Sequence, residues 1–271
     1  MTFDPETIRG FEHRGWERAA AEYAGTFALA SAEFVEALLD GAGIGAGSRV
    51  LDLACGTGLA TAAAARRGAA PTGRDFSAAM LRVARAANPG LAFDLGDAES
   101  LPYGDAAFDA VVSNFGMHHF PRPERAASEA LRVLRPGGRF AFTAWAHPDD
   151  NAAWGLLFAA IRAEGDMDAA QAPPSGGGLQ RPEAVSRVLS EAGFAEIGTA
   201  AVRREWRLAA PADLVASLRR GTVRTAALIE AQDPAAMPAI LAAVERAAAP
   251  YRSGDGYAVP IVAILGEGTR P

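Results

Sequence analysis

Residues 50–58, Val-Leu-Asp-Leu-Ala-Cys-Gly-Thr-Gly, combine the residue types that a nucleoside-binding turn needs. The apolar residues at its start predict a buried strand, and Gly56 and Gly58 predict a tight turn into a helix. Glycine suits such a turn because a ligand can approach its backbone closely and because it tolerates positive φ angles. Asp75 lies 19 residues beyond Gly56, where an acidic residue can accept hydrogen bonds from ribose hydroxyls. The segment therefore predicts a site for a ligand that contains a nucleoside.

Two residues distinguish a dinucleotide from a positively charged ligand at this turn. The dinucleotide pattern has a third glycine, and the corresponding position in this chain is Thr61. Asp52 precedes the turn, and its carboxylate disfavours a pyrophosphate but attracts a ligand that carries an ammonium and a sulfonium group. These residues favour a cationic cofactor, while an NAD-dependent oxidoreductase stays open as an alternative.

Short apolar runs alternate with helical segments from residue 49 to residue 145, a pattern typical of a parallel sheet wrapped by helices. We expect strands at 49–53, in the segment ending at 75, and at 91–95, 108–113 and 139–145, with helices at 59–67, around 80–84 and at 124–134. Two helices, 5–23 and 27–40, precede this unit. After it we expect a helix at 152–164, a helix and strand at 182–192 and 194–206, three helices within 211–249 and a last strand at 257–265. The loop at 166–180, which contains prolines and glycines, is either a lid or an unstructured segment.

Four stretches of the chain match one family in order. They are residues 51–58, Leu-Asp-Leu-Ala-Cys-Gly-Thr-Gly; 73–77, Gly-Arg-Asp-Phe-Ser, with Met80-Leu81; 96–99, Gly-Asp-Ala-Glu, leading to Leu101-Pro102 and Phe108-Asp109; and 134–138, Leu-Arg-Pro-Gly-Gly. The chain thus resembles the class I S-adenosylmethionine (SAM)-dependent methyltransferases, and specifically the small-molecule branch that includes ubiquinone and menaquinone biosynthesis enzymes. The resemblance is strong over residues 45–146 and weak elsewhere.

The resemblance implies both a fold and a domain organisation. The fold is α/β, with a doubly wound, mostly parallel, seven-stranded Rossmann-like sheet, N-terminal helices and a helical cap inserted before the last strand. Residues 1–44 would form a helical segment that covers the cofactor site. Residues 45–206 and 257–271 would form the SAM-binding core, and 207–256 a helical insertion that contributes to the substrate pocket.

The resemblance further implies SAM as cofactor and S-adenosylhomocysteine as product. The residues expected to bind the cofactor are Tyr23, Asp52, Ala54, Gly56, Gly58, Asp75, Phe76, Met80, Asp97, Ala98 and Asn114. Asp52 and the two glycines would surround the methionine part, and Tyr23 would either donate to its carboxylate or belong to the core.

The nucleoside end of SAM has its own expected partners. By the same resemblance, Asp75 would accept hydrogen bonds from both ribose hydroxyls, and Phe76 would pack against adenine. Asp97 would accept from the adenine amino group, while the Ala98 backbone N–H reaches a ring nitrogen. Without the resemblance, a turn or helix-cap role would be the better interpretation of Asp75 and Asp97.

The acceptor is expected beyond the carboxyl ends of the strands, where ligands bind in open parallel sheets. The residues that follow strands 108–113 and 139–145 are Asn114, Phe115, His118, His119 and Trp145. His118 and His119 are the catalytic candidates, because a neutral imidazole can deprotonate a hydroxyl as it attacks. A structural role for either histidine is equally open. The sequence Asn-Phe-Gly-Met at 114–117 lacks the Asn-Pro-Pro-aromatic motif of methylases that act on DNA bases or protein glutamine.

The composition disfavours several classes of binding partner. The net charge of −6 disfavours nucleic acid, since binding to a phosphate backbone rests on basic side chains. The single cysteine, Cys55, allows neither a disulfide framework nor a cysteine metal cluster, and we expect no metal. Apolar runs are too short for a membrane span, and a cytoplasmic protein is expected. We therefore expect a small-molecule acceptor, apolar or aromatic, with the oligomeric state left open and a SAM-binding protein without methyl transfer as a second alternative.

Overall fold

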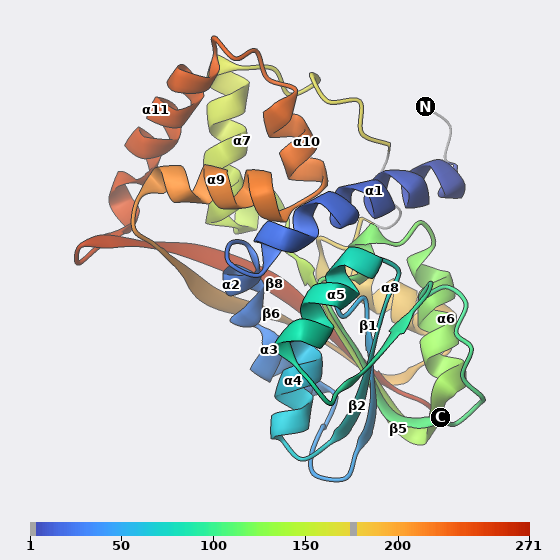
Figure 1. The fold of residues 1–271 in the computed structure, drawn as a ribbon. Coiled ribbons are helices and arrows are strands. Elements are labelled where there is room, and N and C mark those ends of the chain that lie inside the picture. Colours follow the sequence, from blue (N-terminus) through green and yellow to red (C-terminus); the bar gives the residue numbers. More distant parts are fainter. Residues whose placement is uncertain (1–3, 174–177) are drawn as a thin grey trace.

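The computed structural model describes residues 4–173 and 178–271, and its centre is one twisted sheet (Figure 1). The strands are β1 (Arg49–Leu53), β2 (Ala70–Asp75), β3 (Ala92–Leu95), β4 (Phe108–Asn114), β5 (Leu134–Trp145), β6 (Ala195–Leu208), β7 (Arg252–Ser253) and β8 (Gly256–Thr269). Their order is β3-β2-β1-β4-β5-β8-β6, with the two-residue β7 paired to β8. The strands from β3 to β5 are parallel, and β8 is antiparallel to β5 and β6. The expected doubly wound, mostly parallel sheet is confirmed.

Helices cover both faces of the sheet because neighbouring residues on a buried strand point to opposite sides. Leu51 and Val111 pack against α6 (Pro123–Val133) and α8 (Pro182–Ala192). Their neighbours Val50 and Val112 pack against α3 (Val35–Gly41) and α4 (Leu59–Arg66) on the other face. α5 (Ala78–Ala87) packs beside β2 and β3. The near-continuous apolar runs of the parallel strands are thus explained by burial on both sides.

The expected single helix over 27–40 is wrong. The structure has α2 (Ala28–Ala32) and α3 as separate short helices. Phe27 and Phe34 pack against Trp145, in an aromatic cluster, while Val35 and Leu38 pack over the sheet. One straight helix has one apolar stripe and could not bury residues in both places, so tertiary packing overrides the helical spacing of these residues.

Strand β5 also departs from expectation, because it begins at Leu134 rather than at 139. Its pairing with β4 shifts register between Phe108 and Ala110. The Pro136-Gly137-Gly138 segment, which looks like a turn in the sequence, is therefore part of the strand, within an irregularity in which β5 has three more residues than β4.

A layer of helices lies over the antiparallel side of the sheet (Figure 1). It consists of α7 (Ala152–Glu164), α9 (Pro211–Gly221), α10 (Arg224–Glu230) and α11 (Met237–Ala248). The three helices expected within 211–249 are confirmed. The loop at 166–180 includes residues 174–177, which lie outside the described residues. Its start is held by a hydrogen bond from the Asp166 N–H to Gln232 Oε1, 2.8 Å long. Among the helices of residues 4–173 and 178–271, none is long and apolar enough to cross a membrane.

Helix α1 (Pro5–Tyr23) lies between this layer and the body of the sheet (Figure 1). It begins with Pro5 after Asp4, whose side chain accepts a hydrogen bond from the Glu6 N–H and so satisfies a free donor of the first turn. It contacts α5 on one side and α9 on the other. A helix in this place faces the carboxyl ends of β1, β2 and β4, where a ligand is expected.

Candidate cofactor and acceptor site

The turn after β1 has the positive φ angles expected at Gly56 and Gly58, and a further one at Ala54. Ala54 and Gly56 both have φ near +54°, in the region that favours glycine. A side chain at Gly56 would meet no atom within 4 Å, so the backbone there is open to a ligand. At Gly58, which precedes α4, an added Cβ would lie 2.9 Å from Phe93 Cζ. Gly56 is thus suited to ligand approach, whereas Gly58 is required by packing.

Asp75, at the end of β2, is joined to this turn by its carboxylate. The Gly56 N–H donates to one oxygen (2.8 Å), and the Ser77 N–H donates to the other (2.9 Å). Burial raises the pKa of Asp75 to about 6, although these backbone N–H groups act to lower it. Two strand ends therefore present one buried carboxylate held by main-chain donors.

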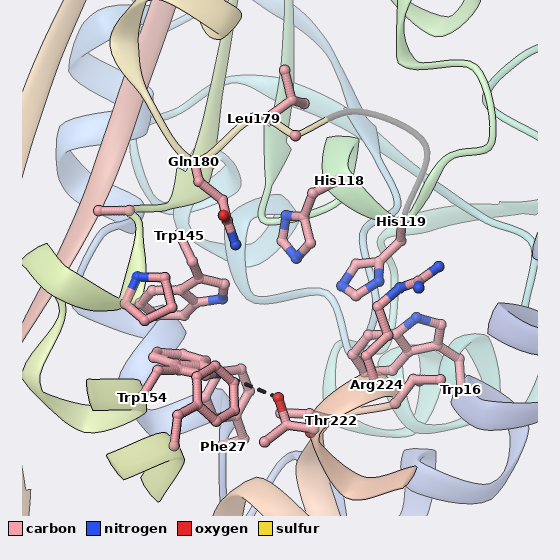
Figure 2. A pocket seen from close by; sticks show the side chains of 16 residues that line it. Trp16, Phe27, His118, His119, Trp145, Trp154, Leu179, Gln180, Thr222 and Arg224 are labelled. Carbon is pink, nitrogen blue, oxygen red and sulfur yellow. Dashed lines mark hydrogen bonds between the residues drawn. The ribbon is translucent and has the colours of Figure 1, made fainter. Parts of the chain in front are cut away.

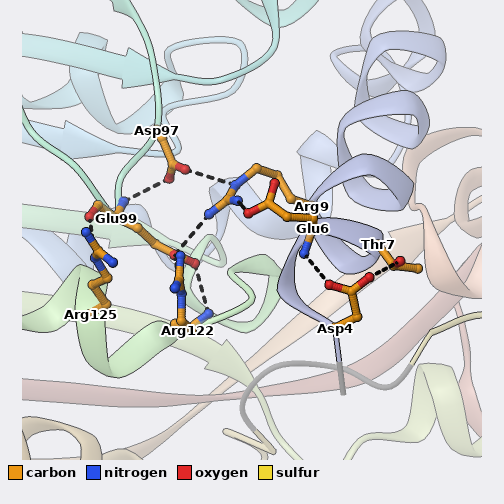
Figure 3. A network of polar contacts seen from close by, with 8 residues as sticks. All are labelled: Asp4, Glu6, Thr7, Arg9, Asp97, Glu99, Arg122 and Arg125. Carbon is orange, nitrogen blue, oxygen red and sulfur yellow. Dashed lines mark hydrogen bonds and ion pairs between the residues drawn. The ribbon is translucent and has the colours of Figure 1, made fainter. Parts of the chain in front are cut away.

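Asp97 follows β3 and lies in a network of charged side chains (Figure 3). One of its oxygens accepts the Glu99 N–H (2.8 Å), and the other lies 3.0 Å from Arg9 Nε of α1. Arg9 also pairs with Glu99, which is almost completely buried and pairs in turn with Arg122 at the start of α6. The network attaches the first turns of α1 to the loop that carries Asp97.

Most of the residues expected to bind the cofactor line one cavity of about 70 Å³. This cofactor-side cavity is lined by Tyr23, Ala54, Gly56, Asp75, Phe76, Met80 and Asn114, together with Trp16, Phe27, Phe115, Gly116, His119, Phe120 and Trp145. A cavity of about 20 Å³ beside Phe76 adds Asp97 and Ala98. Both volumes are below the roughly 300–1,000 Å³ of typical ligand pockets. In this arrangement α1 closes over the site.

Three of the expected residues make internal contacts that the sequence does not reveal. Asp52 and Gly58 line neither cavity. One Asp52 oxygen accepts the Thr61 hydroxyl (2.6 Å), and burial raises its pKa to about 7. Asn114 lines the cofactor-side cavity, but its amide joins Ser31 O (3.1 Å) to the Thr143 hydroxyl (2.8 Å). Tyr23 hydrogen-bonds Ser31 Oγ at 3.1 Å.

A larger cavity of about 250 Å³ is lined by η1 (Met117–His119) and by α7 and α10 of the helical layer (Figure 2). The walls of this acceptor-side cavity are mainly aromatic and apolar, with Trp145, Trp154 and Phe158 among them. Trp16, Phe27, His119 and Trp145 line both this cavity and the cofactor-side cavity. The two cavities therefore adjoin at these four side chains.

The two histidines of η1 differ in their surroundings. His118 points into the acceptor-side cavity (Figure 2), and its Nδ1 is buried without a hydrogen-bond partner among the described residues. Burial, with smaller effects from His119 and Arg224, holds the pKa of His118 well below its usual value. His119 lies at the junction of the cavities, where its Nδ1 is 2.9 Å from Glu12 Oε2 and its ring packs edge-on against Trp16. His118 is thus a neutral imidazole facing the cavity, and His119 is held by a carboxylate.

Comparison with known proteins supports the resemblance over part of the chain. A family described as a methyltransferase domain matches residues 51–142. A demethylmenaquinone methyltransferase from Renibacterium salmoninarum is 40% identical over 111 residues, which make up 41% of this chain and 47% of that protein. The resemblance to SAM-dependent methyltransferases is thus confirmed over residues 51–142. The chain spans about half the length of the curated relatives it matches.

Solved structures share the fold of this protein well beyond the matched segment. Phosphoethanolamine N-methyltransferase 2 from Haemonchus contortus, in complex with S-adenosyl-L-methionine, has a TM-score of 0.54 at 19% identity, over 88% of this chain and 52% of that one. The cyclase SpnF has a TM-score of 0.53 at 22% identity, over 88% and 81%. At these identities the likeness is one of fold alone.

The site also has two charged residues that the sequence does not single out. Glu12 of α1 is fully buried, and Arg224 begins α10 and lines the acceptor-side cavity. Arg224 Nε lies 2.6 Å from Glu12 Oε1, an ion-pair contact that lacks the alignment of a hydrogen bond. An acidic residue at a buried position of an amphipathic helix is the signal that could have identified Glu12, because such a group requires a partner.

Proposed function

We propose that this protein is a methyltransferase that moves a methyl group from SAM to a small organic acceptor, apolar and in part aromatic, which binds in the acceptor-side cavity. The observation that carries the proposal is the junction at Trp16, Phe27, His119 and Trp145, where this cavity adjoins the one lined by Asp75. Two ligands bound in adjoining cavities would meet there. Such alignment can contribute on the order of 7 to 11 kcal/mol to a two-substrate reaction.

The cofactor-side residues suit SAM. Each Asp75 oxygen already accepts one backbone N–H and can accept a further hydrogen bond, which matches a ribose diol. Phe76 lies in the wall between Asp75 and Asp97, where a base would stack. Trp145 and Phe27 at the junction are aromatic rings, a residue type that attracts a positive charge. These features support the proposed roles of Asp75, Phe76 and Asp97.

In the proposed reaction, SAM supplies a methyl group on a sulfonium, which an acceptor atom displaces in line. The aromatic walls of the acceptor-side cavity exclude water and orient the acceptor. His118, which is neutral because burial lowers its pKa, would accept a proton from the acceptor. A base this weak serves best with an acidic hydroxyl. His119, fixed by Glu12, would hold the wall between the two ligands in place.

The proposal is tested with purified protein and methyl-labelled SAM. We expect calorimetry to show binding of S-adenosylhomocysteine, and label to appear on members of a panel of small apolar and aromatic acceptors. Thermal unfolding should shift upward with S-adenosylhomocysteine and stay unchanged with NAD, because only a ligand of the folded state stabilises it. The proposal would be overturned if neither SAM nor its product binds. A rise in unfolding temperature with NAD alone would favour the oxidoreductase.

A SAM-binding protein with a different reaction is the second candidate. It is favoured by the likeness of the fold to the cyclase SpnF, because a fold can support unrelated chemistries. The same experiment separates the two, since a protein of this kind would bind SAM tightly yet leave the label on SAM with every acceptor in the panel.

A further inference from the structure

Glu12 connects three elements that are distant in the sequence. It lies on α1, its Oε2 is 2.9 Å from His119 Nδ1 on η1, and its Oε1 is 2.6 Å from Arg224 Nε on α10. Burial acts to raise the pKa of Glu12, but His119 and Arg224 outweigh that effect and the pKa is lowered. Glu12 is therefore an ionised carboxylate that fixes both of these neighbours from behind the acceptor-side cavity.

Arg224 has donors left over after these contacts. Its Nη1 donates to the Pro173 carbonyl (2.5 Å), and its guanidinium lies over the Phe11 ring, 5.6 Å from the centroid. Its Nη2 is buried and has no hydrogen-bond partner in the part of the chain that the structure describes. A buried guanidinium nitrogen without an acceptor is costly, so a ligand that supplies an oxygen there would gain a charge-assisted hydrogen bond.

The cavity wall gives this donor a definite selectivity. Arg224 is the formally charged member of the described lining, which otherwise consists of aromatic, apolar and neutral polar side chains and the two histidines. Figure 2 shows the guanidinium beside His119 and Trp16, across the cavity from Trp145 and Trp154. No carboxylate belongs to the described lining, because Glu12 lies behind it. The wall therefore presents one cation to whatever enters.

We propose that Arg224 selects an acceptor that carries an anionic oxygen on an apolar or aromatic body. The oxygen, either a carboxylate or an ionised hydroxyl, binds the Arg224 guanidinium where this side chain lines the cavity, while the body packs against Trp145 and Trp154. Glu12 is the positioning residue that holds the guanidinium in place. This inference rests on the proposed function in so far as the bound anion is called a methyl acceptor. The binding preference for an anion does not itself require methyl transfer.

The test compares matched ligands that differ in charge and little in shape. Quenching of tryptophan fluorescence would measure binding of 2-naphthoate against 2-naphthamide, and of 4-nitrophenolate at pH 8 against 4-nitroanisole. The variants are Arg224→Gln, Arg224→Lys and, as a control, Arg219→Gln, which removes an exposed arginine of α9 that pairs with Glu230. Binding of S-adenosylhomocysteine is measured separately by calorimetry.

We expect the native protein to prefer at least one anion to its neutral match by about tenfold or more, as a hydrogen bond to a charged group implies. The pair that shows the preference identifies the anion as carboxylate or phenolate. Arg224→Gln should abolish the preference, and Arg219→Gln should preserve it. Arg224→Lys should retain part of it, since lysine keeps the charge but not the planar array of donors.

Equal binding of anion and neutral match in both pairs, by the native protein, would overturn the inference whether or not the variants fold. A preference that survives in folded Arg224→Gln would overturn it as well. If the preference is present but SAM and its product do not bind, the anion site stands and the proposed function fails. If the product binds and the preference is absent, the proposed function stands and the anion site fails.

Discussion

The cofactor side and the acceptor side of the site are built by different means. On the cofactor side, acidic side chains are fixed by backbone N–H groups at strand ends, as Asp75 is by Gly56 and Ser77. On the acceptor side, Glu12 is fixed by His119 and Arg224, which are far from it in the sequence and lie on different elements. The first arrangement is a property of turns after parallel strands, whereas the second exists only once α1 and the helical layer have packed together.

This difference implies different sensitivities. A carboxylate bound by main-chain donors depends little on neighbouring side chains, so the cofactor side should tolerate changes in the cap. A buried ion pair fails when either partner is removed, because the remaining charge is left uncompensated. The acceptor side should therefore be altered by single substitutions that leave cofactor binding intact.

Replacing His118 should have the largest effect and should separate the two sides. With an acceptor in hand, His118→Ala should lower kcat by roughly 100- to 10,000-fold, the range of a general base, and leave the affinity for S-adenosylhomocysteine unchanged. Because the pKa of His118 lies well below its usual value, the native rate should not fall as the pH is lowered through about 6.5, the ordinary pKa of histidine. His147→Ala, at a half-buried histidine next to Asp149, is the control. A kcat within threefold of native would exclude His118 as the base.

Replacing Asp75 should affect the cofactor side of the site. Asp75→Ala removes the proposed acceptor of two ribose hydroxyls, and charge-assisted hydrogen bonds contribute about 1.5–3 kcal/mol each. The affinity for S-adenosylhomocysteine, measured by calorimetry, should fall by about 100-fold or more. Asp75→Asn, which keeps one acceptor oxygen for the Gly56 or Ser77 N–H, should lose less. Unchanged affinity in a folded Asp75→Ala protein would place the nucleoside elsewhere.

Glu12→Gln tests the claim that the acceptor side depends on a buried pair. Removing one partner of a buried pair costs about 3–5 kcal/mol, and the partial exposure of Arg224 reduces this to roughly 2–3 kcal/mol. Chemical unfolding should show this loss, and the anion preference of the cavity should change. Glu22→Gln, at an exposed glutamate on the same helix, should have little effect on either. Equal stability of the two variants would show that Glu12 carries no structural charge.

The comparison also explains what could be predicted from the sequence. The sequence was sufficient to predict the turn at Gly56, the position of Asp75 and the parallel strands. Their contacts are local or follow from hydrophobic runs. The clustering of Ala54, Phe76, Met80 and Ala98 follows from the same order of strands. Their roles toward SAM stay predictions.

The parts that could not be predicted depend on contacts between distant segments. The break between α2 and α3 arises because Phe34 joins the aromatic cluster around Trp145, which is more than a hundred residues away. The partners of Glu12 are equally distant, and no spacing rule connects them. The sequence suggested that Asp52 faces a cationic ligand, whereas in the structure its hydrogen-bond partner is Thr61. The sequence of a short strand does not indicate in which direction a side chain at its end points.

Asp52→Asn tests that buried position by its pH dependence. Burial raises the pKa of Asp52 to about 7 in the folded protein, above the usual 3.8. Between about pH 4 and 7 the folded state then holds a proton that the unfolded state has lost, so stability falls as the pH rises, by up to about 1.4 kcal/mol per pH unit. The thermal unfolding temperature of Asp52→Asn should change less with pH across this window than that of the native protein. Asp255→Asn, at an exposed turn, should show the same pH dependence as the native protein. Parallel curves for native and Asp52→Asn proteins would contradict the buried-acid interpretation.

Arg9→Ala should have the smallest effect, and it tests whether α1 competes with the cofactor. Arg9 Nε occupies the Asp97 oxygen proposed for the adenine amino group, and its other contacts hold the start of α1 against the loop. Partly exposed ion pairs contribute only about 0–1 kcal/mol, so the affinity for S-adenosylhomocysteine should rise by no more than about fivefold. The gain should shrink as salt is added, since screening already weakens the native pair. Arg18→Ala, at an exposed position of the same helix, should leave the affinity unchanged. If Arg9→Ala instead binds more weakly, the contact between Arg9 and Asp97 assists the bound state, and the two sides of the site are joined through α1 more closely than their separate construction suggests.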